Sequence, residues 1–139
     1  MSRTSFAWQF ASIATPIDGS ADHCAVQIAR AVQERCGVQL PIVRGDQPIK
    51  TQHALALGCL ANNPFIKELY LRWQTLVDRW YPGSGGYVLQ TVARTHALTG
   101  SALVLGGSDA QGVAAATAAF LPIVLTSNNG EIPWLLKVV

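Results

Sequence analysis

Apolar residues recur three and four positions apart in two stretches of the chain, which is the pattern of a helix with one buried face. The first stretch predicts a helix over residues 21–36, and Gly37 is placed to end it. The second predicts a long helix over residues 65–80, because Asn63 is a capping residue and Pro64 suits the first turn. We expect its apolar stripe to pack in the core; the stripe consists of Phe65, Ile66, Leu69, Trp73, Leu76, Val77 and Trp80.

Shorter apolar or alternating runs predict the strands, and an alanine-rich run predicts a third helix. Strands are expected at residues 38–43, 53–58, 87–92 and 102–105, of which the last two form a long hairpin. The third helix follows Ser108, which has the spacing of a capping box with Gln111, and it is expected to end before Pro122. This succession predicts an α/β sandwich, in which about three helices pack on a mixed sheet of four to five strands.

The two ends of the chain carry different signals. The start has one arginine and an apolar patch that Gln9 and Ser12 interrupt, so we expect an ordered strand or loop rather than a cleaved export signal. The stretch 123–139 is apolar to its last residue, which is unusual for a free end. We expect residues 1–139 to form a single α/β domain, and 123–139 to be a linker or an edge strand toward a missing domain.

Composition excludes several classes of function. Of the 139 residues only 13% are charged and 50% are hydrophobic, and the net charge is +2. Such a chain is too apolar to be intrinsically disordered, and it has no apolar run long enough to span a bilayer. Its basic residues are scattered, so neither nucleic acid nor a membrane is an expected partner. The three cysteines have no C-x-x-C spacing, and we expect free, buried thiols.

Side chains that carry catalysis do not form a recognisable set. The eight carboxylates are isolated from one another and give no candidate pair for glycoside hydrolysis. The three histidines lack the spacing of a metal site, and no G-x-S-x-G motif marks a nucleophile. We therefore expect no catalytic residue, metal or cofactor in this chain, although a triad of residues distant in sequence stays an open alternative.

One glycine-rich turn lies where a strand leads into a helix, the position at which phosphates bind in dinucleotide-binding folds. It extends from Gly106 to Gly112 but fits neither G-x-G-x-x-G nor the P-loop, because Val113 stands where the P-loop has lysine. Asp109 would also repel an anion there. A capped, tightly packed turn is the favoured interpretation, and a stand-alone binder of a phosphate or nucleotide is the alternative.

Aromatic residues gather around the second helix and the turn that follows it. Trp73 is expected in the core, whereas Trp80 and Tyr81 are equally compatible with the core and with an interface. Together with Tyr87 and Trp134 they are the candidate interface or ligand residues, because aromatic rings stack on sugars and on protein partners. A self-associating module that uses Trp80, Tyr81 and the tail is a further alternative.

Three segments of the chain together resemble a known family. A strand that ends in Gly58 is followed by Gly86-Tyr87 with an alternating strand, and then by an apolar strand, a Gly-x-x-Asp-x-x-Gly motif and a helix. The motif is formed here by Gly106, Asp109 and Gly112. This succession resembles the small α/β domain that precedes the catalytic barrel in α-glucuronidases and β-N-acetylhexosaminidases, over most of residues 10–122. The early helix at 21–36 fits that domain, whereas the long helix at 65–80 departs from its compact form.

The resemblance implies a non-catalytic role, because in that family the reacting residues lie in the barrel, and none is carried over to this chain. We therefore expect an N-terminal accessory domain of a carbohydrate-active enzyme. Its partner would be a catalytic domain of the same parent chain or of another subunit, with carbohydrate as a further partner. A periplasmic or secreted location follows if the parent degrades polysaccharides. The low charge predicts that the surface near Trp80, Tyr81 and 132–139 is covered by another domain or chain.

Overall fold

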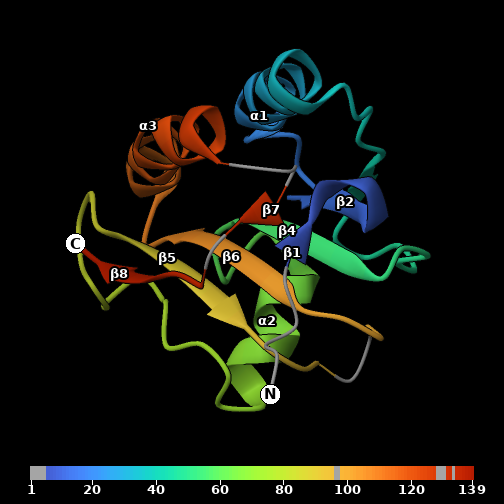
Figure 1. The fold of residues 1–139 in the computed structure, drawn as a ribbon. Coiled ribbons are helices and arrows are strands. Elements are labelled where there is room, and N and C mark those ends of the chain that lie inside the picture. Colours follow the sequence, from blue (N-terminus) through green and yellow to red (C-terminus); the bar gives the residue numbers. More distant parts are fainter. Residues whose placement is uncertain (1–5, 96–97, 128–130, 133) are drawn as a thin grey trace.

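A six-stranded mixed sheet is the centre of the computed structural model, which describes residues 6–95, 98–127, 131–132 and 134–139 (Figure 1). The strands are β2 (Ala11–Thr15), β3 (Ile42–Arg44), β4 (His53–Gly58), β5 (Tyr87–Val92), β6 (Ala102–Gly107) and β8 (Leu136–Val138). Their order across the sheet is β3-β2-β4-β6-β5-β8. A separate antiparallel ladder joins β1 (Phe6–Ala7) to β7 (Glu131–Ile132). The start of the chain, where it is described, is thus ordered, with a short 3-10 helix η1 (Trp8–Phe10) before β2.

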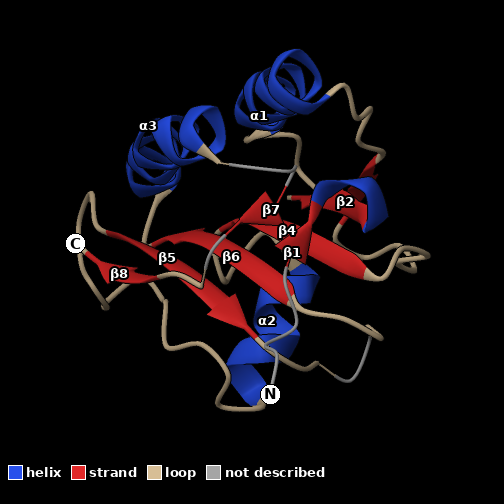
Figure 2. Cartoon of the chain, viewed as in Figure 1, coloured by secondary structure: helices blue, strands red, loops and turns tan. Residues whose placement is uncertain are grey.

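Three helices cover the sheet, two on one face and one on the other (Figure 2). Helices α1 (Asp22–Cys36) and α3 (Ala110–Thr126) pack side by side on one face, and α2 (Pro64–Leu71) lies on the opposite face. The predicted order of strands and helices is confirmed, and so is the end of α1, where Gly37 adopts the left-handed conformation at φ 72°. The fold is a three-layer α/β sandwich.

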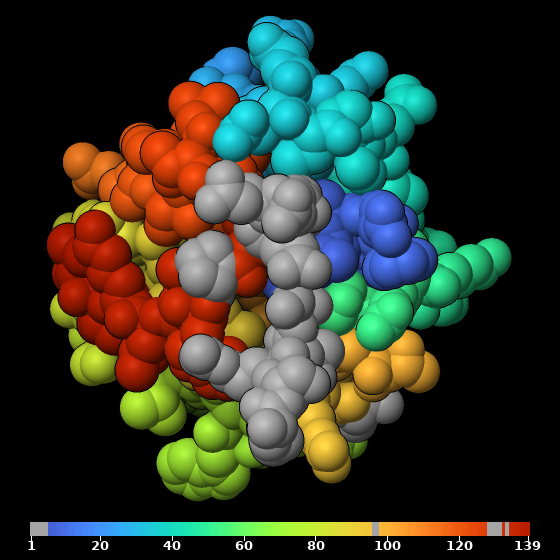
Figure 3. Space-filling model, in the orientation of Figure 1, coloured from blue at the N-terminus to red at the C-terminus, as the bar shows by residue number. Residues whose placement is uncertain are grey.

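The predicted number of strands was too low by one, because the apolar tail adds β8 to the sheet, and the predicted bounds of β3 were too wide. Strand β3 was expected over 38–43 but pairs with β2 only from Ile42 onward, after Pro41, which has no N–H to donate. Strand β8 comes from the apolar tail and pairs antiparallel with β5. In the space-filling view β8 lies open at one side of the molecule (Figure 3), and the side chain of Leu136 is 73% exposed.

Helix α3 continues through the predicted stop at Pro122 and ends at Thr126. Proline in a helix removes the hydrogen bond to the carbonyl group four residues earlier, here that of Ala118. Both residues are exposed, so water can bond the freed carbonyl. The hydroxyl of Thr126 donates to the carbonyl of Pro122 (2.9 Å) and closes the last turn. Residues 123–126, expected to begin a linker or an edge strand, therefore belong to the helix.

The predicted long helix over 65–80 is wrong beyond Leu71, where α2 ends. Trp73 adopts the left-handed conformation at φ 61°, and the N–H groups of Trp73 and Gln74 bond carbonyls in the last turn of α2 (3.1 and 2.9 Å). This arrangement is a Schellman motif, which stops a helix and usually has glycine at the left-handed position. The chain then forms a loop that leads to β5.

The apolar spacing beyond Leu71 therefore belongs to a folded loop rather than to a helix face. Val77 does reach the core, on the α2 side of the sheet. Trp73 and Leu76, expected in the core, are instead 85% and 56% exposed. Trp80 is 77% exposed. Apolar residues spaced three to four positions apart are expected in a helix, but an irregular loop can show the same spacing by chance. The spacing alone therefore cannot distinguish the two structures.

The two faces of the sheet carry cores of different size. Beneath α1 and α3 the indole of Trp8 is fully buried, with ring centres 5.1 Å from Phe6 and 6.1 Å from Phe120. The smaller core beneath α2 contains Ile66 and Leu69 together with residues of β4, β5 and β6. Because α2 has eight residues against fifteen and seventeen in α1 and α3, it covers much less of its face.

The buried side chain of Asn63 joins the start of α2 to two strands. Its Oδ1 accepts the N–H of Phe65 (2.9 Å), which caps α2 as the sequence predicted. Its Nδ2 donates to the carbonyls of Ala14 (3.1 Å) and Leu57 (2.9 Å), at the ends of β2 and β4. A Cβ at Gly45, just after β3, would strike the amide. Asn63 therefore fixes where α2 leaves the sheet.

We predict that Asn63→Ala lowers the free energy of unfolding by about 3 kcal/mol, because it removes a helix cap and the only described side-chain donor to two strand-end carbonyls. Asn62→Ala is the matched control, since the amide of Asn62 makes more exposed bonds to Cys59 and Ser20 and should cost about 1 kcal/mol. Urea denaturation measures both values. Equal losses in the two variants would contradict the role given to Asn63.

Candidate functional site at the carboxyl edge of the sheet

The carboxyl ends of four strands meet at one edge of the sheet, because β3, β2, β4 and β6 are parallel to their neighbours in this group. Open α/β sheets bind ligands outside this edge, at the point where successive connections leave toward opposite faces. Here α1 follows β2 on one face and α2 follows β4 on the other. The expected position of a ligand crevice is therefore between the ends of β2 and β4.

The protein's own polar groups close that crevice. The N–H of Ile17, after β2, donates to the carbonyl of Asn62, after β4 (2.9 Å). The amide of Asn62 donates to the hydroxyl of Ser20 (3.2 Å), and the amide of Asn63 lies buried below. These bonds join the two connections directly, so a ligand would have to displace them.

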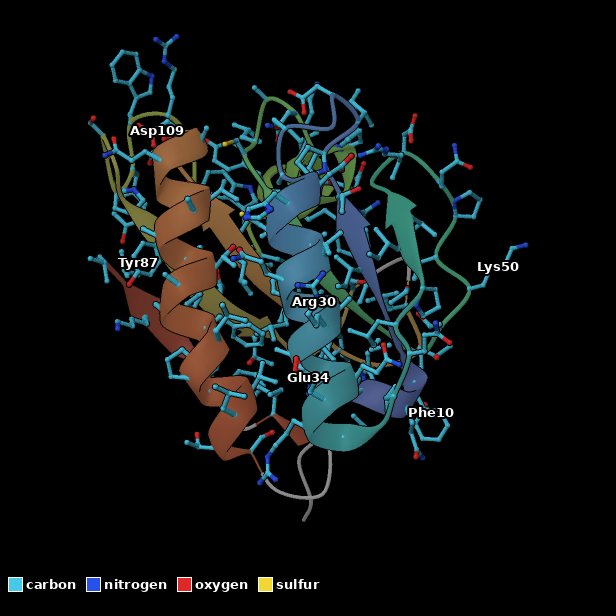
Figure 4. All side chains as sticks on the ribbon, turned by 90° about the horizontal axis from the view of Figure 1, so that it is seen from above. Phe10, Arg30, Glu34, Lys50, Tyr87 and Asp109 are labelled. Carbon is cyan, nitrogen blue, oxygen red and sulfur yellow. The ribbon has the colours of Figure 1, made fainter. Side chains whose placement is uncertain are left out.

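The glycine-rich turn after β6 is closed in the same way. The carboxylate of Asp109 accepts the N–H groups of Gly85 (3.0 Å) and Gly112 (2.8 Å) at the start of α3, where Figure 4 labels it. These bonds hold the pKa of Asp109 below its usual range. A Cβ at Gly112 would strike the carbonyl oxygen of Gly86. The geometry is that of a capped, tightly packed turn, with a negative charge where a phosphate would bind.

The predicted capping box is wrong in its first member. Helix α3 begins at Ala110, so Asp109 rather than Ser108 occupies the N-cap position. The hydroxyl of Ser108 instead accepts the N–H of Gly83 (3.0 Å), in the loop before β5. Ser108 and Asp109 thus both tie that loop to the start of α3, which is a role that local helix rules do not reveal.

An open cavity of about 530 Å³ lies beside these closed turns. It is bounded by the connection after β4, by α2 and by the loop between α2 and β5. The residues that line it are Cys59, Leu60, Ala61, Lys67, Tyr70, Leu71, Asp78, Arg79, Trp80 and Ser108. We call this space the carboxyl-edge cavity. Its volume lies within the range of about 300–1,000 Å³ that is usual for small-molecule sites.

Asp78 organises the loop between α2 and β5. One carboxylate oxygen accepts the hydroxyl of Tyr70 in α2 (2.7 Å), and the other accepts the N–H groups of Trp80 (2.9 Å) and Tyr81 (2.8 Å). The bond from Tyr70 is the main reason that the pKa of Asp78 lies below its usual range, and the same bond raises the pKa of Tyr70. Asp78 is therefore an ionised acceptor that fixes the turn.

Amide side chains fasten the loop further along its length. The amide of Gln74 donates to the carbonyl of Arg94 (2.6 Å), and the amide of Gln90 in β5 donates to the carbonyl of Gln74 (2.9 Å). With the bonds from Asp78, Ser108 and Asp109, the loop is held to α2, to β5 and to α3. The exposure of its apolar side chains is consequently a property of a fixed conformation.

This fastened loop and the end of α2 hold large apolar side chains in solvent. We call Leu71, Trp73, Leu76 and Tyr81 the apolar loop face; Trp73 is 85% exposed, and the others are 61%, 56% and 44% exposed. They line a hollow of about 300 Å³ together with Tyr70 and Asp78. Trp80 does not line this hollow and instead borders the carboxyl-edge cavity.

Trp73 combines a strained backbone with a side chain that contributes little to the stability of the domain. The left-handed backbone conformation costs a non-glycine residue about 1–2 kcal/mol relative to glycine. The indole also stays in water, so its large apolar area contributes little to the core. Residues held in such conformations cluster at functional sites, where a local rule is broken for the sake of the site.

The four candidate aromatic residues have different positions. Trp80 and Tyr81 lie on the fastened loop, at the carboxyl-edge cavity and the apolar loop face respectively. Trp134 is 46% exposed and lies between β7 and β8. Tyr87 is buried beside α3 at the start of β5 and does not belong to the surface (Figure 4).

Sequence reasoning did not identify the roles of Tyr70 and Asp78, and it did not predict that Trp73 is exposed. The reason is the same for all three residues, because the apolar spacing favoured a continuous helix through this region. A local signal was present, since an aspartate that precedes Pro82 and Gly83 by a few positions is typical of a turn in which the carboxylate accepts following N–H groups.

The thiol of Cys59 lines the cavity but is held in its protonated form. Burial, followed by the charges of Asp109 and Asp18, raises its pKa to about 11. All three cysteines are free and half-buried. Within the described ranges, the structure brings together no group of three His, Cys, Asp or Glu side chains that could hold a metal ion.

Comparison with protein-family models gives no match for this chain, and comparison with curated protein sequences gives none either. Of the helices in the part of the chain that the structure describes, none has both the length and the apolar character needed to cross a membrane.

We predict that Trp73→Gly stabilises the 139-residue chain by about 1 kcal/mol relative to Trp73→Ala, because glycine adopts the left-handed conformation without strain and alanine does not. Both variants lose the same exposed indole, so their difference isolates the backbone. Chemical denaturation measures the difference. Equal stability, or a less stable glycine variant, would show that the backbone at this position is not strained.

Cys59 should react with iodoacetamide far more slowly in the folded chain than in the chain unfolded in urea. A pKa raised from 9.0 to about 11 leaves about a hundredfold less thiolate at mildly alkaline pH. Peptide mapping by mass spectrometry gives the rate at this position, with the unfolded chain as the control. A rate that unfolding increases less than about fivefold would contradict the protonated, half-buried thiol.

Proposed function

We propose that this chain is a non-catalytic accessory domain of a carbohydrate-active enzyme, and that it packs against the catalytic domain through the apolar loop face. The observation that carries the proposal is Trp73, a left-handed, 85% exposed tryptophan on a loop fastened by hydrogen bonds. Carbohydrate chemistry is supported by the resemblance of the glycine and strand motifs to the domain that precedes the barrel in α-glucuronidases and β-N-acetylhexosaminidases.

Incomplete coverage of the α2 face of the sheet supports a second layer there. Leu136 and Val138 of β8 lie opposite Gln90 and Val88 of β5, so their side chains share the α2 face. They are 73% and 44% exposed. Exposed apolar side chains of this size, with aromatic rings among them, are typical of the buried centre of a protein interface.

The energetic gain from covering the apolar loop face would be substantial. Full burial of a large apolar side chain contributes about 1.5–3 kcal/mol, and Leu71, Trp73 and Leu76 are each more than half exposed. That gain would exceed the cost of the strained backbone at Trp73. A partner domain would thus offset the backbone strain that the fastened loop carries at Trp73.

Engaged polar groups support the non-catalytic part of the proposal. Asp78 and Asp109 accept backbone or hydroxyl hydrogens that fix turns, and Cys59 is protonated. Asp109 also stands where the alternative function, binding of a phosphate or nucleotide, would need a free helix terminus.

Trp73→Gly tests the proposal, because it should act with opposite sign in two proteins. In the 139-residue chain it should raise the melting temperature above that of the unchanged chain, because it relieves the backbone strain and removes an indole that contributes little to the core. In the protein encoded by the complete reading frame of the gene it should lower the melting temperature, since an indole is lost from the contact with the catalytic domain. Phe10→Ala is the control, because it removes an exposed aromatic ring outside the apolar loop face and should act alike in both proteins.

Two results would contradict the proposal. One is stabilisation by Trp73→Gly in both proteins, which would mean that the apolar loop face stays uncovered. The other is a reading frame that encodes no further domain, together with a chain that forms no complex with a separately encoded carbohydrate-active subunit.

A further inference from the structure

The outer edge of β8 presents backbone groups that no described strand of the protein pairs. β8 is the last strand in the order of the six-stranded sheet, and among the described residues its ladder partner is β5. In the space-filling view β8 forms one side of the molecule (Figure 3). An open sheet edge is a template on which an extended segment of another chain can add a strand.

The hydrogen bonds to β5 show which residues of this part of the chain face inward. Val139 exchanges both of its backbone bonds with Tyr87, at 3.0 and 3.1 Å. Leu135 accepts the N–H of Thr91 at its carbonyl oxygen (2.9 Å). Because backbone groups of successive residues in an antiparallel strand point in alternate directions, every second residue between these two also faces β5.

Leu136 and Val138 are the residues that face the open side. Their N–H and carbonyl groups point away from β5, so a further strand could exchange backbone bonds with both residues. Their side chains lie on the α2 face of the sheet and are 73% and 44% exposed. Residues directly opposite each other in a sheet share a face, so apolar side chains of an added strand would pack beside these two.

Lys137, between them, points to the other face of the sheet. It lies opposite Leu89 of β5, which packs in the core beneath α1 and α3. The side chain of Lys137 is exposed, and it takes part in neither of the salt bridges found among the described residues. An acidic side chain placed opposite Lys137 on an added strand would form a favourable cross-strand pair.

Pairing between copies of this chain suits the edge less well. An antiparallel pairing of the whole of β8 with a second β8 puts Lys137 directly opposite its counterpart, and like charges in that position destabilise a sheet. The opposite edge of the sheet, at β3, is also less open. The carbonyl of Arg44, which points away from β2, already accepts the N–H of Gln47 (3.0 Å).

We propose that the edge of β8 binds an extended segment of a partner protein, which adds antiparallel to β8 as a further strand of the sheet. The segment carries apolar residues opposite Leu136 and Val138 and an acidic residue opposite Lys137. Antiparallel addition is favoured because parallel pairing is less stable per residue. This inference goes beyond the proposed accessory role and does not rest on it, since the 139-residue chain itself forms the edge.

Titration of the isotope-labelled chain with the peptide acetyl-Thr-Val-Glu-Val-Thr-amide, followed by NMR, tests the proposal. Saturable binding should shift the backbone amides of Leu136 and Val138 more than those of β3 at the opposite edge. A peptide with lysine in place of glutamate should bind about fivefold more weakly. The variant Lys137→Glu should reverse this preference between the two peptides.

Methylated peptides test the backbone contacts without altering the protein. In the proposed register the N–H groups of both valines face β8, so N-methylation of the two valines should weaken binding about tenfold or more. N-methylation of the glutamate is the matched control, because its N–H points away from β8, and this peptide should retain most of its binding.

Two variants of the chain make the same comparison from the other side. Leu136→Pro removes an N–H that faces the open side and no N–H that bonds to β5, so it should weaken the peptide while the chain stays folded. Leu136→Ala keeps that N–H and should retain more of the binding. The melting temperature of each variant reports folding.

The proposal is overturned if the acidic peptide gives no saturable binding, or if the largest shifts lie away from β8. It is also overturned if the lysine peptide binds as tightly, or if methylation of the valines and of the glutamate has equal effects. A dimer detected by sedimentation that Leu136→Pro abolishes would overturn it too, because the occupant of the edge would then be a second copy of the chain.

Discussion

One buried amide determines where the second layer of this fold begins. The side chain of Asn63 caps α2 and donates to the ends of β2 and β4, so the helix leaves the sheet at a fixed point. With α2 in place, the hydroxyl of Tyr70 reaches Asp78, and Asp78 folds the turn that follows. The exposed tryptophans of the loop thus depend on a hydrogen-bond chain that starts in the interior.

Hydrogen bonds between the protein's own polar groups also determine which part of the carboxyl edge stays open. Asn62 closes the crevice between β2 and β4, and Asp109 occupies the start of α3. What remains is the cavity next to Trp80 and, beyond the turn, the apolar face around Trp73. The carboxyl-edge cavity and the hollow at the apolar loop face share Tyr70, Leu71 and Asp78, so a partner at one would contact a wall of the other.

Local signals in the sequence were sufficient for most of the architecture. Gly37 marked the end of α1, Asn63 with Pro64 marked the start of α2, and the alternating run at Tyr87–Val92 marked one arm of the hairpin. These features are set by capping, by proline geometry and by side-chain period, which act over a few residues.

The failures arise where tertiary contacts override those local rules. The Schellman motif at the end of α2 has Trp73 at the position where glycine is usual, so the sequence contains no signal for a helix end. The apolar spacing therefore predicted a longer helix, whereas α2 ends at Leu71. Pro122 is tolerated because Ala118, whose carbonyl it frees, is an exposed residue that water can reach. Of the candidate residues, Tyr87 is buried, whereas Trp80 and Tyr81 lie at the site through bonds from Asp78 that no sequence period encodes.

Hydroxyl-radical footprinting read by mass spectrometry tests most directly the proposal that another domain covers the apolar loop face. Trp73, Leu76 and Tyr81 should be modified readily in the 139-residue chain and strongly protected in the protein encoded by the complete reading frame. Phe10, which is 48% exposed and lies away from this face, should react alike in both and calibrates the comparison. Equal modification of Trp73 in the two proteins would contradict the account.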